Sequence, residues 1–443
     1  MSGQPRAELR VHWRCDETLV WGPAKPALLS DCPQGLMRAP DAGIRHGPDI
    51  GKKHHNNGAR TMYVGMDAEG SIAGLEKLLA EATVNPQVGG LVVLTCDANA
   101  FTPERLNPLL AAAAVPLIGG VFPAIMHNGK RYEQGTVVWG VGNRMRVAEI
   151  PGLSDPEMDF EKTLDEAFPP SEGESTQLVF VDGFARRISD FIDALFNVFG
   201  LEANTIGGGA GSLSMVQKPC LLTRSGMIMD AAVVAAFDVH SGVGVSHGWT
   251  PIGGPFQVTK AEHNVIVSLD WRPAFEVYRE VVEAHAHAQF EQEGFFELAK
   301  AYPFGIAKMD AEHVVRDPFQ VGEKGSLVCV GEVPEGAHVS ILNGDRDSLL
   351  AAAVAARALS EQRLGADTPA RLRLFMDCIS RVLFLEDDFD EEIAAVALPD
   401  RPLVGACTIG EIASNGIDYL EFYNKTSVVA SIAEHAITEH SPA

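Results

Sequence analysis

The chain has 443 residues, of which 46% are hydrophobic, and its formal net charge at pH 7 is −24. This acidic excess argues against a nucleic acid or an anionic membrane surface as the partner, because both attract Lys and Arg. No apolar run approaches the roughly 18 residues that span a bilayer, and the N-terminus lacks the residue order of a signal peptide. We therefore expect a protein that contacts neither nucleic acid nor membrane.

The cysteines favour a reducing compartment. There are seven, widely spaced and without a C-x-x-C pair, which argues against a disulfide framework and against a cysteine zinc site. The absence of C-x-x-C-H excludes covalent attachment of a c-type haem. We expect a cytoplasmic protein.

Residues 1–60 differ from the rest of the chain. They are rich in proline and show neither helical nor strand periodicity, so we expect a tail with little structure. The pair His54-His55 fits a solvated polar run better than a metal site, because nothing nearby completes a ligand set. A natural start at an internal methionine, such as Met62, is a further hypothesis.

From residue 61 onward, short apolar strands alternate with helices of 10–15 residues. The pattern predicts a helix over 71–83, strands over 90–97 and 177–183, and a helix over 188–200. This alternation indicates an α+β fold, with mixed and antiparallel sheets covered by helices. We expect a first domain over 61–270.

The second predicted domain covers 271–432. A hairpin precedes it, with Glu262-His263-Asn264 at its tip, and a single long helix is predicted from Pro273 to Tyr302. A helix over 345–363 and a strand over 370–378 follow. We expect the two domains to pack intimately, and residues 433–443 to form a frayed tail.

One short motif raises the hypothesis of a hydrolase. The stretch Gly244-Val245-Ser246-His247-Gly248 matches the nucleophile elbow G-x-S-x-G, in which a helix follows the serine directly. Here Trp-Thr-Pro-Ile-Gly-Gly-Pro follows instead, and two prolines with two glycines do not start a helix. We expect the match to be accidental and keep a Ser246 nucleophile as an alternative.

A second glycine cluster lies in GGGAGS, residues 207–212. It follows a predicted helix and ends without Lys-Ser or Lys-Thr, so it is not a P-loop. Glycines of this kind more often serve tight turns than ligands. Five small residues in a row would also allow a ligand or a neighbouring strand to approach the backbone closely.

Several polar residues are candidates for binding. His247 is the best single ligand candidate, as a structural histidine or as the proximal ligand of a noncovalent haem. Cys378 lies beside Asp377 and Arg381, which could lower its pKa, although a buried inert cysteine is commoner. Glycines punctuate the C-terminal segment, where polar side chains suit a hydrogen-bonding pocket or satisfied turns.

Taken in order, several motifs resemble the FIST domain. The series begins with GGGAGS, AAVVAAF, GVSHGWTPIG and VTKAEHNVIVSLDWRPAFEVY, and continues with LFMDCISR, GACTIGEIASNG and FYNKTSVV. LFMDCISR resembles the Cys-x-x-Arg segment of the family, and the last two resemble its Gly-Glu-Ile and Asn-x-Thr close. The resemblance covers roughly 63–430, as a FIST part followed by a FIST C part. The family pattern has His before Asn-x-Thr, whereas this chain has Tyr423.

The resemblance implies a sensory role in signal transduction. Members of the family are proposed to bind small molecules such as amino acids, and a bacterial subset resembles haem proteins that sense nitric oxide and regulate a partner histidine kinase. An F-box, which eukaryotic relatives carry, is not found here. If the position of Tyr423 contacts a ligand or metal, the chemistry here differs from the family pattern, although tyrosine also ligates haem iron.

We therefore expect a cytoplasmic ligand sensor rather than an enzyme, with a small-molecule ligand and a histidine kinase or another signalling protein as partner. A haem b sensor of nitric oxide, with His247 on the iron, and a Ser246 hydrolase are the alternatives. The expected ligand-binding residues come from the segments described above and are Gly207, Gly208, Gly209, Gly211, Ser212, Arg224, Ser246, His247, Trp249, Cys378, Arg381, Glu411, Asn415, Asn424 and Thr426.

Overall fold

The structure is a computed structural model that describes residues 9–12, 20–23, 62–142, 144–168, 176–200, 203–308, 312–399, 401–414 and 419–433. The chain divides into two compact units, Met1–Arg60 and Thr61–Ala443. In the first unit, β1 (Leu9–His12) pairs with β2 (Val20–Pro23) in an antiparallel hairpin. Mixed and antiparallel sheets covered by helices confirm the α+β class. Within the described ranges, no helix is both long enough and apolar enough to cross a membrane.

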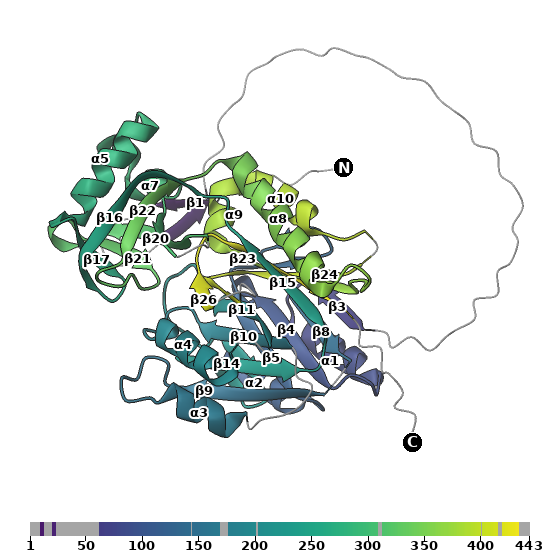
Figure 1. The fold of residues 1–443 in the computed structure, drawn as a ribbon. Coiled ribbons are helices and arrows are strands. Elements are labelled where there is room, and N and C mark those ends of the chain that lie inside the picture. Colours follow the sequence, from purple (N-terminus) through teal and green to yellow (C-terminus); the bar gives the residue numbers. More distant parts are fainter. Residues whose placement is uncertain are drawn as a thin grey trace, which may run out of the picture. The chain divides into compact units, whose positions relative to one another are not determined.

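The second unit repeats one order of elements three times, in residues 63–141, 145–237 and 241–432, which we call modules 1, 2 and 3 (Figure 1). Each module begins with a strand and continues with a helical segment, a second strand, a second helical segment and a third strand. A hairpin and a last strand complete it.

Module 1 contains β3 (Tyr63–Asp67), α1 (Ile72–Val84), β4 (Gly90–Cys96), α2 (Pro103–Ala111), β5 (Leu117–Phe122), the hairpin of β6 (Ala124–His127) and β7 (Lys130–Tyr132), and β8 (Thr136–Val141). Module 2 contains β9 (Met145–Pro151), α3 (Phe160–Ala167), β10 (Thr176–Asp182), α4 (Ile188–Phe199), β11 (Asn204–Ala210), the hairpin of β12 (Leu221–Thr223) and β13 (Gly226–Ile228), and β14 (Ala231–Phe237).

Module 3 contains β15 (Ser241–Ser246), α8 (Arg346–Leu364), β23 (Leu372–Cys378), α9 (Ile379–Leu385), α10 (Phe389–Val396), β24 (Leu403–Thr408), the hairpin of β25 (Glu411–Ser414) and β26 (Leu420–Tyr423), and β27 (Ser427–Ile432). Between β15 and α8, module 3 carries an insertion of residues 250–343.

Strand pairing within the modules follows one pattern. The second strand pairs in parallel with the third, as β4 does with β5, β10 with β11 and β23 with β24. The same strand pairs antiparallel with the last strand of its module, which is β8, β14 or β27. That last strand pairs antiparallel with the first strand, which is β3, β9 or β15.

The hairpins connect the modules in a cycle. The hairpin of module 1 extends the sheet of module 3 through β6 and β24. The hairpin of module 2 extends the sheet of module 1 through β12 and β5, and that of module 3 extends the sheet of module 2 through β25 and β11. Because each sheet contains a hairpin from another module, the three modules form one interlocked body.

One glycine in each parallel pair permits the close contact between its strands. A Cβ added to Gly119, Gly207 or Gly405 would lie 2.3, 1.7 or 2.1 Å from the carbonyl oxygen of Val93, Val179 or Phe375, respectively. These three glycines hold the same place in the three modules. In module 2 this glycine is the first of GGGAGS. Residues 207–210 of that segment belong to the strand β11, so the tight turn considered there from the sequence is corrected to a strand.

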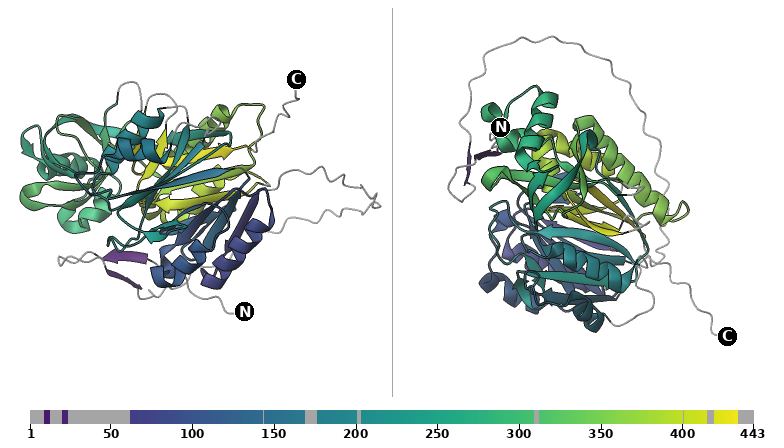
Figure 2. Two further views of the ribbon diagram at one scale, coloured as in Figure 1. Left: turned by 90° about the horizontal axis from the view of Figure 1, so that it is seen from below. Right: turned by 60° about the vertical axis from the view of Figure 1, so that its left-hand side comes forward.

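The inner faces of the three sheets meet in a common apolar core. Leu178 and Phe180 of module 2 share one cluster with Leu374 and Met376 of module 3 and with buried residues of β4 and β5. Phe180 also packs edge-to-face against Phe122 of module 1, with ring centroids 5.3 Å apart. The outer faces are covered by helices, as the apolar clusters beneath α3 and α4 and beneath α8, α9 and α10 show (Figure 2).

The insertion forms a seven-stranded sheet with short helices, which we call the inserted sheet. It contains β16 (Thr250–Glu262), β17 (Val265–Leu269), β18 (Arg272–Pro273), α5 (Ala274–Ala286), α6 (Phe290–Glu293), α7 (Phe295–Ala299), β19 (Phe304–Ile306), β20 (Val314–Val321), β21 (Leu327–Val330) and β22 (His338–Asn343). In Figure 1 it lies to the left of the three modules.

Local predictions in this region had mixed outcomes. The hairpin with its tip near His263 is confirmed by the pairing of β16 with β17. The single helix predicted from Pro273 to Tyr302 is wrong, because the segment is divided into α5, α6 and α7. His287 and Gly294 adopt positive φ angles of 53° and 85°, which a continuous right-handed helix does not accommodate.

Candidate functional site

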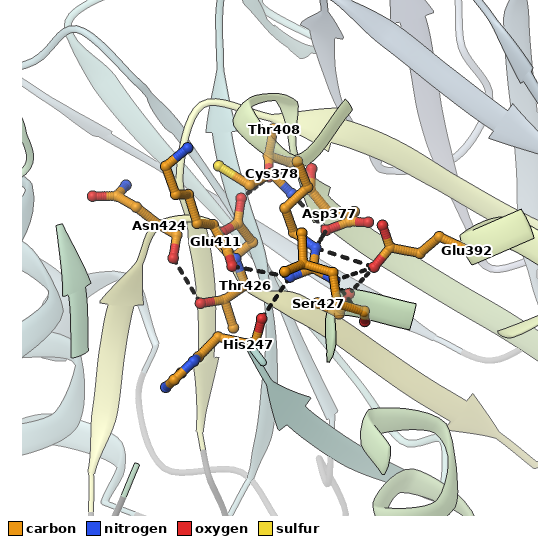
Figure 3. A network of polar contacts seen from close by, with 12 residues as sticks. His247, Asp377, Cys378, Glu392, Thr408, Glu411, Asn424, Thr426 and Ser427 are labelled. Atoms are coloured by element: carbon orange, nitrogen blue, oxygen red, sulfur yellow. Dashed lines mark hydrogen bonds and ion pairs between the residues drawn. The ribbon is translucent and has the colours of Figure 1, made fainter. Parts of the chain in front are cut away.

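The carboxyl ends of β23 and β24 in module 3 carry a buried set of polar residues, shown in Figure 3. Carboxyl ends of parallel strands are the common location of ligand sites in sheets of this kind. We call this set the Arg381 network. It consists of His247, Asp377, Cys378, Arg381, Glu392, Thr408, Glu411, Asn424, Lys425, Thr426 and Ser427, all of which are buried.

Arg381, on α9, joins five segments of module 3. Its Nη1 donates to the carbonyl oxygens of His247 at 2.8 Å and Lys425 at 3.2 Å, and its Nη2 donates to the carbonyl of Leu349 at 3.0 Å. Its Nε lies 3.1 Å from Oε1 of Glu392 and 3.2 Å from Oδ1 of Asp377. The guanidinium therefore holds the bend after β15, the start of α8 and the turn before β27 against two acids.

Asp377 and Glu392 share the single guanidinium of Arg381, so two acidic groups face one positive group. Glu392 Oε1 also accepts from the Ser427 hydroxyl at 2.9 Å, but Glu392 Oε2 and Asp377 Oδ2 have no hydrogen-bond partner. Burial, and then the Glu392 carboxylate, raise the pKa of Asp377 against the opposing effect of Arg381. The network thus contains more buried acceptors than its own donors satisfy.

Glu411 links the network to the glycine-rich strand of module 2. The Thr408 hydroxyl donates to its Oε1 at 2.7 Å, and the Thr426 N–H lies 3.4 Å from its Oε2. Burial raises the pKa of Glu411 to about 8, although the Thr408 hydroxyl and the Cys378 thiol donate to the carboxylate. Glu411 pairs with Gly208 of β11, where a Cβ would lie 2.7 Å from the Gly410 carbonyl oxygen. The glycines of GGGAGS therefore accommodate a neighbouring strand.

The glycines around the Ser246-His247 bend accommodate a helix. A Cβ on Gly242 or Gly244 would lie 2.3 or 1.9 Å from the carbonyl oxygen of Ser360 or Ala356 of α8. A Cβ on Gly248 would lie 2.4 Å from the carbonyl oxygen of Ser348, in the first turn of the same helix. The spacing G-x-G-x-x-x-G thus lets α8 pack directly on the strand backbone.

His247 is neutral and has one free ring nitrogen. Burial first, and then the charges of Arg381 and His313, lower its pKa to about 3. Its Nδ1 accepts from the N–H of Trp249 at 2.9 Å, so the proton of the neutral ring is on Nε2. Nε2 has no hydrogen-bond partner and lies 3.8 Å from Oε2 of Glu312.

This bonding does not fit a haem on His247. A proximal histidine binds iron through a ring nitrogen with a free lone pair and donates from the other nitrogen. In His247 the nitrogen turned away from Trp249 carries the proton, and the other one accepts. Among the described residues, no group of three or more His, Cys, Asp or Glu is arranged to hold a metal ion.

The hydrolase motif does not form a nucleophile elbow. Ser246 ends β15 and is followed, after three residues, by strand β16 instead of a helix. The Ser246 hydroxyl donates to Oε1 of Glu312 at 3.2 Å, whereas His247 is engaged with the Trp249 N–H. An imidazole acting on the serine, which the triad chemistry requires, is not provided by His247.

Lys425 extends the network towards the inserted sheet. Its Nζ lies 3.3 Å from Asp317 Oδ2 and donates to the Lys300 carbonyl at 2.9 Å. Its own carbonyl accepts from Trp249 Nε1 at 3.0 Å, and the Trp249 ring centroid lies 5.4 Å from Nζ. Lys425 is only 1% exposed.

The structure brings some of the expected site residues together and separates others. Eight of the expected residues belong to the Arg381 network or contact it directly: Gly208, His247, Trp249, Cys378, Arg381, Glu411, Asn424 and Thr426. Ser246 lies at the margin, on Glu312. Gly211 and Ser212 belong to the joint with module 1, where the Ser212 hydroxyl donates to Asp97.

Two further expected residues do not join the network. Arg224 is exposed at the tip of the β12–β13 hairpin, beside the amino end of β5. Gly211 instead contacts Val121 near the carboxyl end of β5, so the two residues lie at opposite ends of this strand. Asn415 lies outside the described residues. Gly207 and Gly209 serve strand contacts in β11, since the Gly209 N–H donates to the Gly410 carbonyl.

Several members of the network were missed by sequence reasoning. Asp377 adjoins Cys378, and Lys425 lies inside the Asn-x-Thr motif, so the motifs themselves pointed to both. Thr408 precedes the Gly-Glu-Ile segment in the same way. Glu392 lies in the acidic run EDDFDEE, which looks like a solvated helix start, and no sequence signal distinguishes it from its neighbours.

The comparisons with known proteins identify the family of the chain. A family model described as the FIST N domain matches residues 90–272, and one described as the FIST C domain matches residues 274–414. The comparison with curated proteins found no significant match. FIST domains are in general small-ligand-sensing domains of signal-transduction proteins. The chain belongs to the FIST family and contains both of its domains.

Proposed function

We propose that this chain is a small-ligand sensor and that it binds its ligand at the Arg381 network. The observation that supports the proposal is a concentration of buried polar atoms without a hydrogen-bond partner. An unpaired buried polar atom costs about 1–3 kcal/mol, which a ligand that bonds to it recovers. The atoms in or beside the network are His247 Nε2, Asp317 Oδ1, Asp377 Oδ2, Glu392 Oε2 and Asn424 Oδ1.

The chemistry of these atoms favours a ligand with an ammonium group. All of them except His247 Nε2 are acceptors, and Asp377 and Glu392 share the single guanidinium of Arg381. A cationic donor would therefore balance the acids. The proton on His247 Nε2 would suit an acceptor on the same ligand. An α-amino acid carries both groups, and we propose an amino acid as the ligand.

Proton release would accompany this binding. Burial and Glu392 raise the pKa of Asp377, so the empty network holds a proton on Asp377 more readily than a solvated aspartate does. An ammonium group beside Asp377 would lower that pKa again and displace the proton. Calorimetric titrations in two buffers of different ionisation enthalpy would measure the number of protons released.

A thermal-shift screen tests the proposal. The probes are the twenty common amino acids, putrescine and succinate, each added in excess at pH 7. We expect at least one ammonium compound to raise the melting temperature, since a ligand at 100 times its Kd stabilises by about 2.7 kcal/mol. The same compound should lose its effect on Glu392→Gln and keep it on Asp97→Asn, a substitution at the equivalent edge of module 1.

Two outcomes would contradict the proposal. If no probe shifts the melting temperature, the chain is not a sensor of these compounds. If a probe shifts Glu392→Gln as much as the wild type, its site lies elsewhere. The proposal includes a receiving signalling protein, such as the histidine kinase implied by the family resemblance, and co-purification with and without the active compound would test it.

A further inference from the structure

The inserted sheet contains a group of packed aromatic rings. Aromatic rings of α5, α6, α7 and β19 pack against one another, with ring centroids 5.2 Å apart for Tyr278 and Phe304 and 5.5 Å for Phe290 and Phe295. Tyr278 is fully buried and donates from its hydroxyl to the Tyr302 carbonyl at 2.7 Å. These contacts pack α5, α6 and α7 against the strands of the inserted sheet.

The buried polar attachment of this sheet centres on Lys425. Its ammonium forms an ion pair with the Asp317 carboxylate and donates to the Lys300 carbonyl, both in the inserted sheet. Its backbone carbonyl bonds with module 3, through Arg381 Nη1 and Trp249 Nε1. Lys425 adopts a φ of 50°, a left-handed conformation that a non-glycine residue takes up at some cost. Lys425 thus connects the inserted sheet to Arg381 through buried contacts.

Apolar side chains pack around this attachment. Trp249 packs against Phe384 of α9, with ring centroids 5.3 Å apart, and belongs to one apolar cluster with Val315 and Leu342 of the inserted sheet. Beside Asp317, the Arg316 Nη1 donates to the carbonyl of Phe422 at 2.9 Å. A charge pair in such surroundings is strong when its geometry is kept and costly when one partner is displaced.

We propose that the inserted sheet is the element that responds to the state of the Arg381 network, and that Lys425 is the positioning residue that couples the two. A rearrangement at Arg381 displaces the Lys425 carbonyl, and this displacement moves its ammonium away from Asp317. Packed interfaces of this kind exchange between discrete arrangements, so a small shift at Lys425 loosens the attachment of the whole sheet. The inference goes beyond the proposed function and does not depend on the identity of a ligand.

Hydrogen-exchange mass spectrometry on the full chain tests the attachment. In Lys425→Met we expect peptides that cover β19 and β20 to exchange about tenfold faster, while peptides of β4 and β10 keep the wild-type rate and report an intact core. Lys308→Met is the matched control. Lys308 pairs with Glu421 across the same interface, but it is about one-third exposed, so its loss should change exchange by less than about twofold.

The coupling is tested with Arg381→Lys, since the hydrogen bonds and ion pairs of Arg381 described above include none with the inserted sheet. We expect this variant to accelerate exchange in β19 and β20 as well. In the double variant with Lys425→Met, the fold-increase in the exchange rate of β19 and β20 should be smaller than the product of the two single increases. The reason is that both substitutions act through one connection.

Two results would overturn the inference. The first is that Arg381→Lys accelerates exchange in β23 and α9 but leaves β19 and β20 unchanged. The second is that the double variant shows the full product of the two single increases in exchange rate. If Lys425→Met fails to fold, as faster exchange in β4 and β10 would reveal, Asp317→Asn makes the same test from the side of the inserted sheet.

Discussion

The carboxyl edges of modules 1 and 3 have the same backbone plan and very different side chains. Cys96 and Cys378 hold equivalent places at the ends of β4 and β23. In module 1 the adjoining Asp97 is partly exposed and is paired on both oxygens, by Lys218 at 2.5 Å and by the Ser212 hydroxyl at 2.6 Å. In module 3 two fully buried acids share Arg381 and retain unpaired oxygens.

Module 2 resembles module 1 in this respect. The buried carboxylate of Asp182 accepts from the N–H groups of Phe184 and Asp230 and from the Gln217 amide. Its two oxygens are therefore satisfied within the protein. Among the described residues, Oδ1 of the neighbouring Asp230 is the unpaired atom at this edge, whereas the edge of module 3 has four, on His247, Asp377, Glu392 and Asn424. The comparison teaches that a repeated backbone supplies three similar edges, and that the number of unpaired buried polar atoms, more than strand geometry, distinguishes them.

The largest effect that would sharpen this comparison is expected from Arg381→Met. The variant leaves Asp377 and Glu392 buried without a countercharge, and breaking a buried pair in this way costs about 3–5 kcal/mol. Urea unfolding followed by circular dichroism measures the loss. A loss below about 1 kcal/mol would show that the acids are already neutral or solvated, and that the edge of module 3 is not unusual.

A smaller effect is expected from the glycines that the three modules share. Gly207→Ala should destabilise by about 1–3 kcal/mol or more, because its Cβ would meet the Val179 carbonyl oxygen at 1.7 Å. Gly119→Ala should destabilise the protein less, because its Cβ would lie 2.3 Å from the Val93 carbonyl oxygen. Gly142→Ala is the control, because its Cβ would meet nothing within 4 Å. Equal melting temperatures for all three variants would contradict the assigned role of these glycines.

The third prediction concerns the pH dependence conferred by Glu411. Its pKa is about 8 in the folded chain, against an ordinary value of 4.5. Between these values the folded state binds more protons, so this group stabilises fully below pH 4.5 and the stabilisation is lost as the pH rises through 8. Relative to Glu411→Gln, the wild type should lose up to about 1.4 kcal/mol per pH unit in this window.

Urea unfolding of both proteins at pH 5, 6, 7 and 8 measures this difference. A difference that stays constant over the four values would mean that Glu411 titrates normally.

The smallest effect is expected from Lys218→Met in module 1. Lys218 is 43% exposed and Asp97 29%, and ion pairs of this kind contribute about 0–1 kcal/mol. Added salt should remove most of the difference in unfolding free energy between the variant and the wild type. A loss as large as that of Arg381→Met would end the distinction between the two edges.

Much of the local structure followed from the sequence. The helices over 71–83, 188–200 and 345–363 and the strand over 370–378 are present, because their apolar periodicity and caps act over a few residues. The Asp345 side chain, for example, accepts from the Ser348 N–H and starts α8. The long helix after Pro273 was wrong because the backbone takes positive φ angles at His287 and Gly294, which interrupt the helix.

The threefold repeat was missed, although the sequence holds a faint signal for it. The third strands read Ile118-Gly119, Ile206-Gly207 and Val404-Gly405 at equivalent places. Two matching residues per repeat are too few to stand out in a chain with 43 glycines. The insertion of 250–343 further obscures the period in module 3.

The sequence by itself determined the class of elements, the family and six of the eleven residues of the Arg381 network, since periodicity and motif order are local properties. Only the tertiary structure decided what those side chains do. It converted two glycine-rich segments from suspected ligand loops into surfaces for a strand and a helix, and it placed Glu392 and Lys425 beside Arg381. Burial and pairing depend on residues far apart in the chain, so a buried acid and a solvated one look alike until the chain has folded.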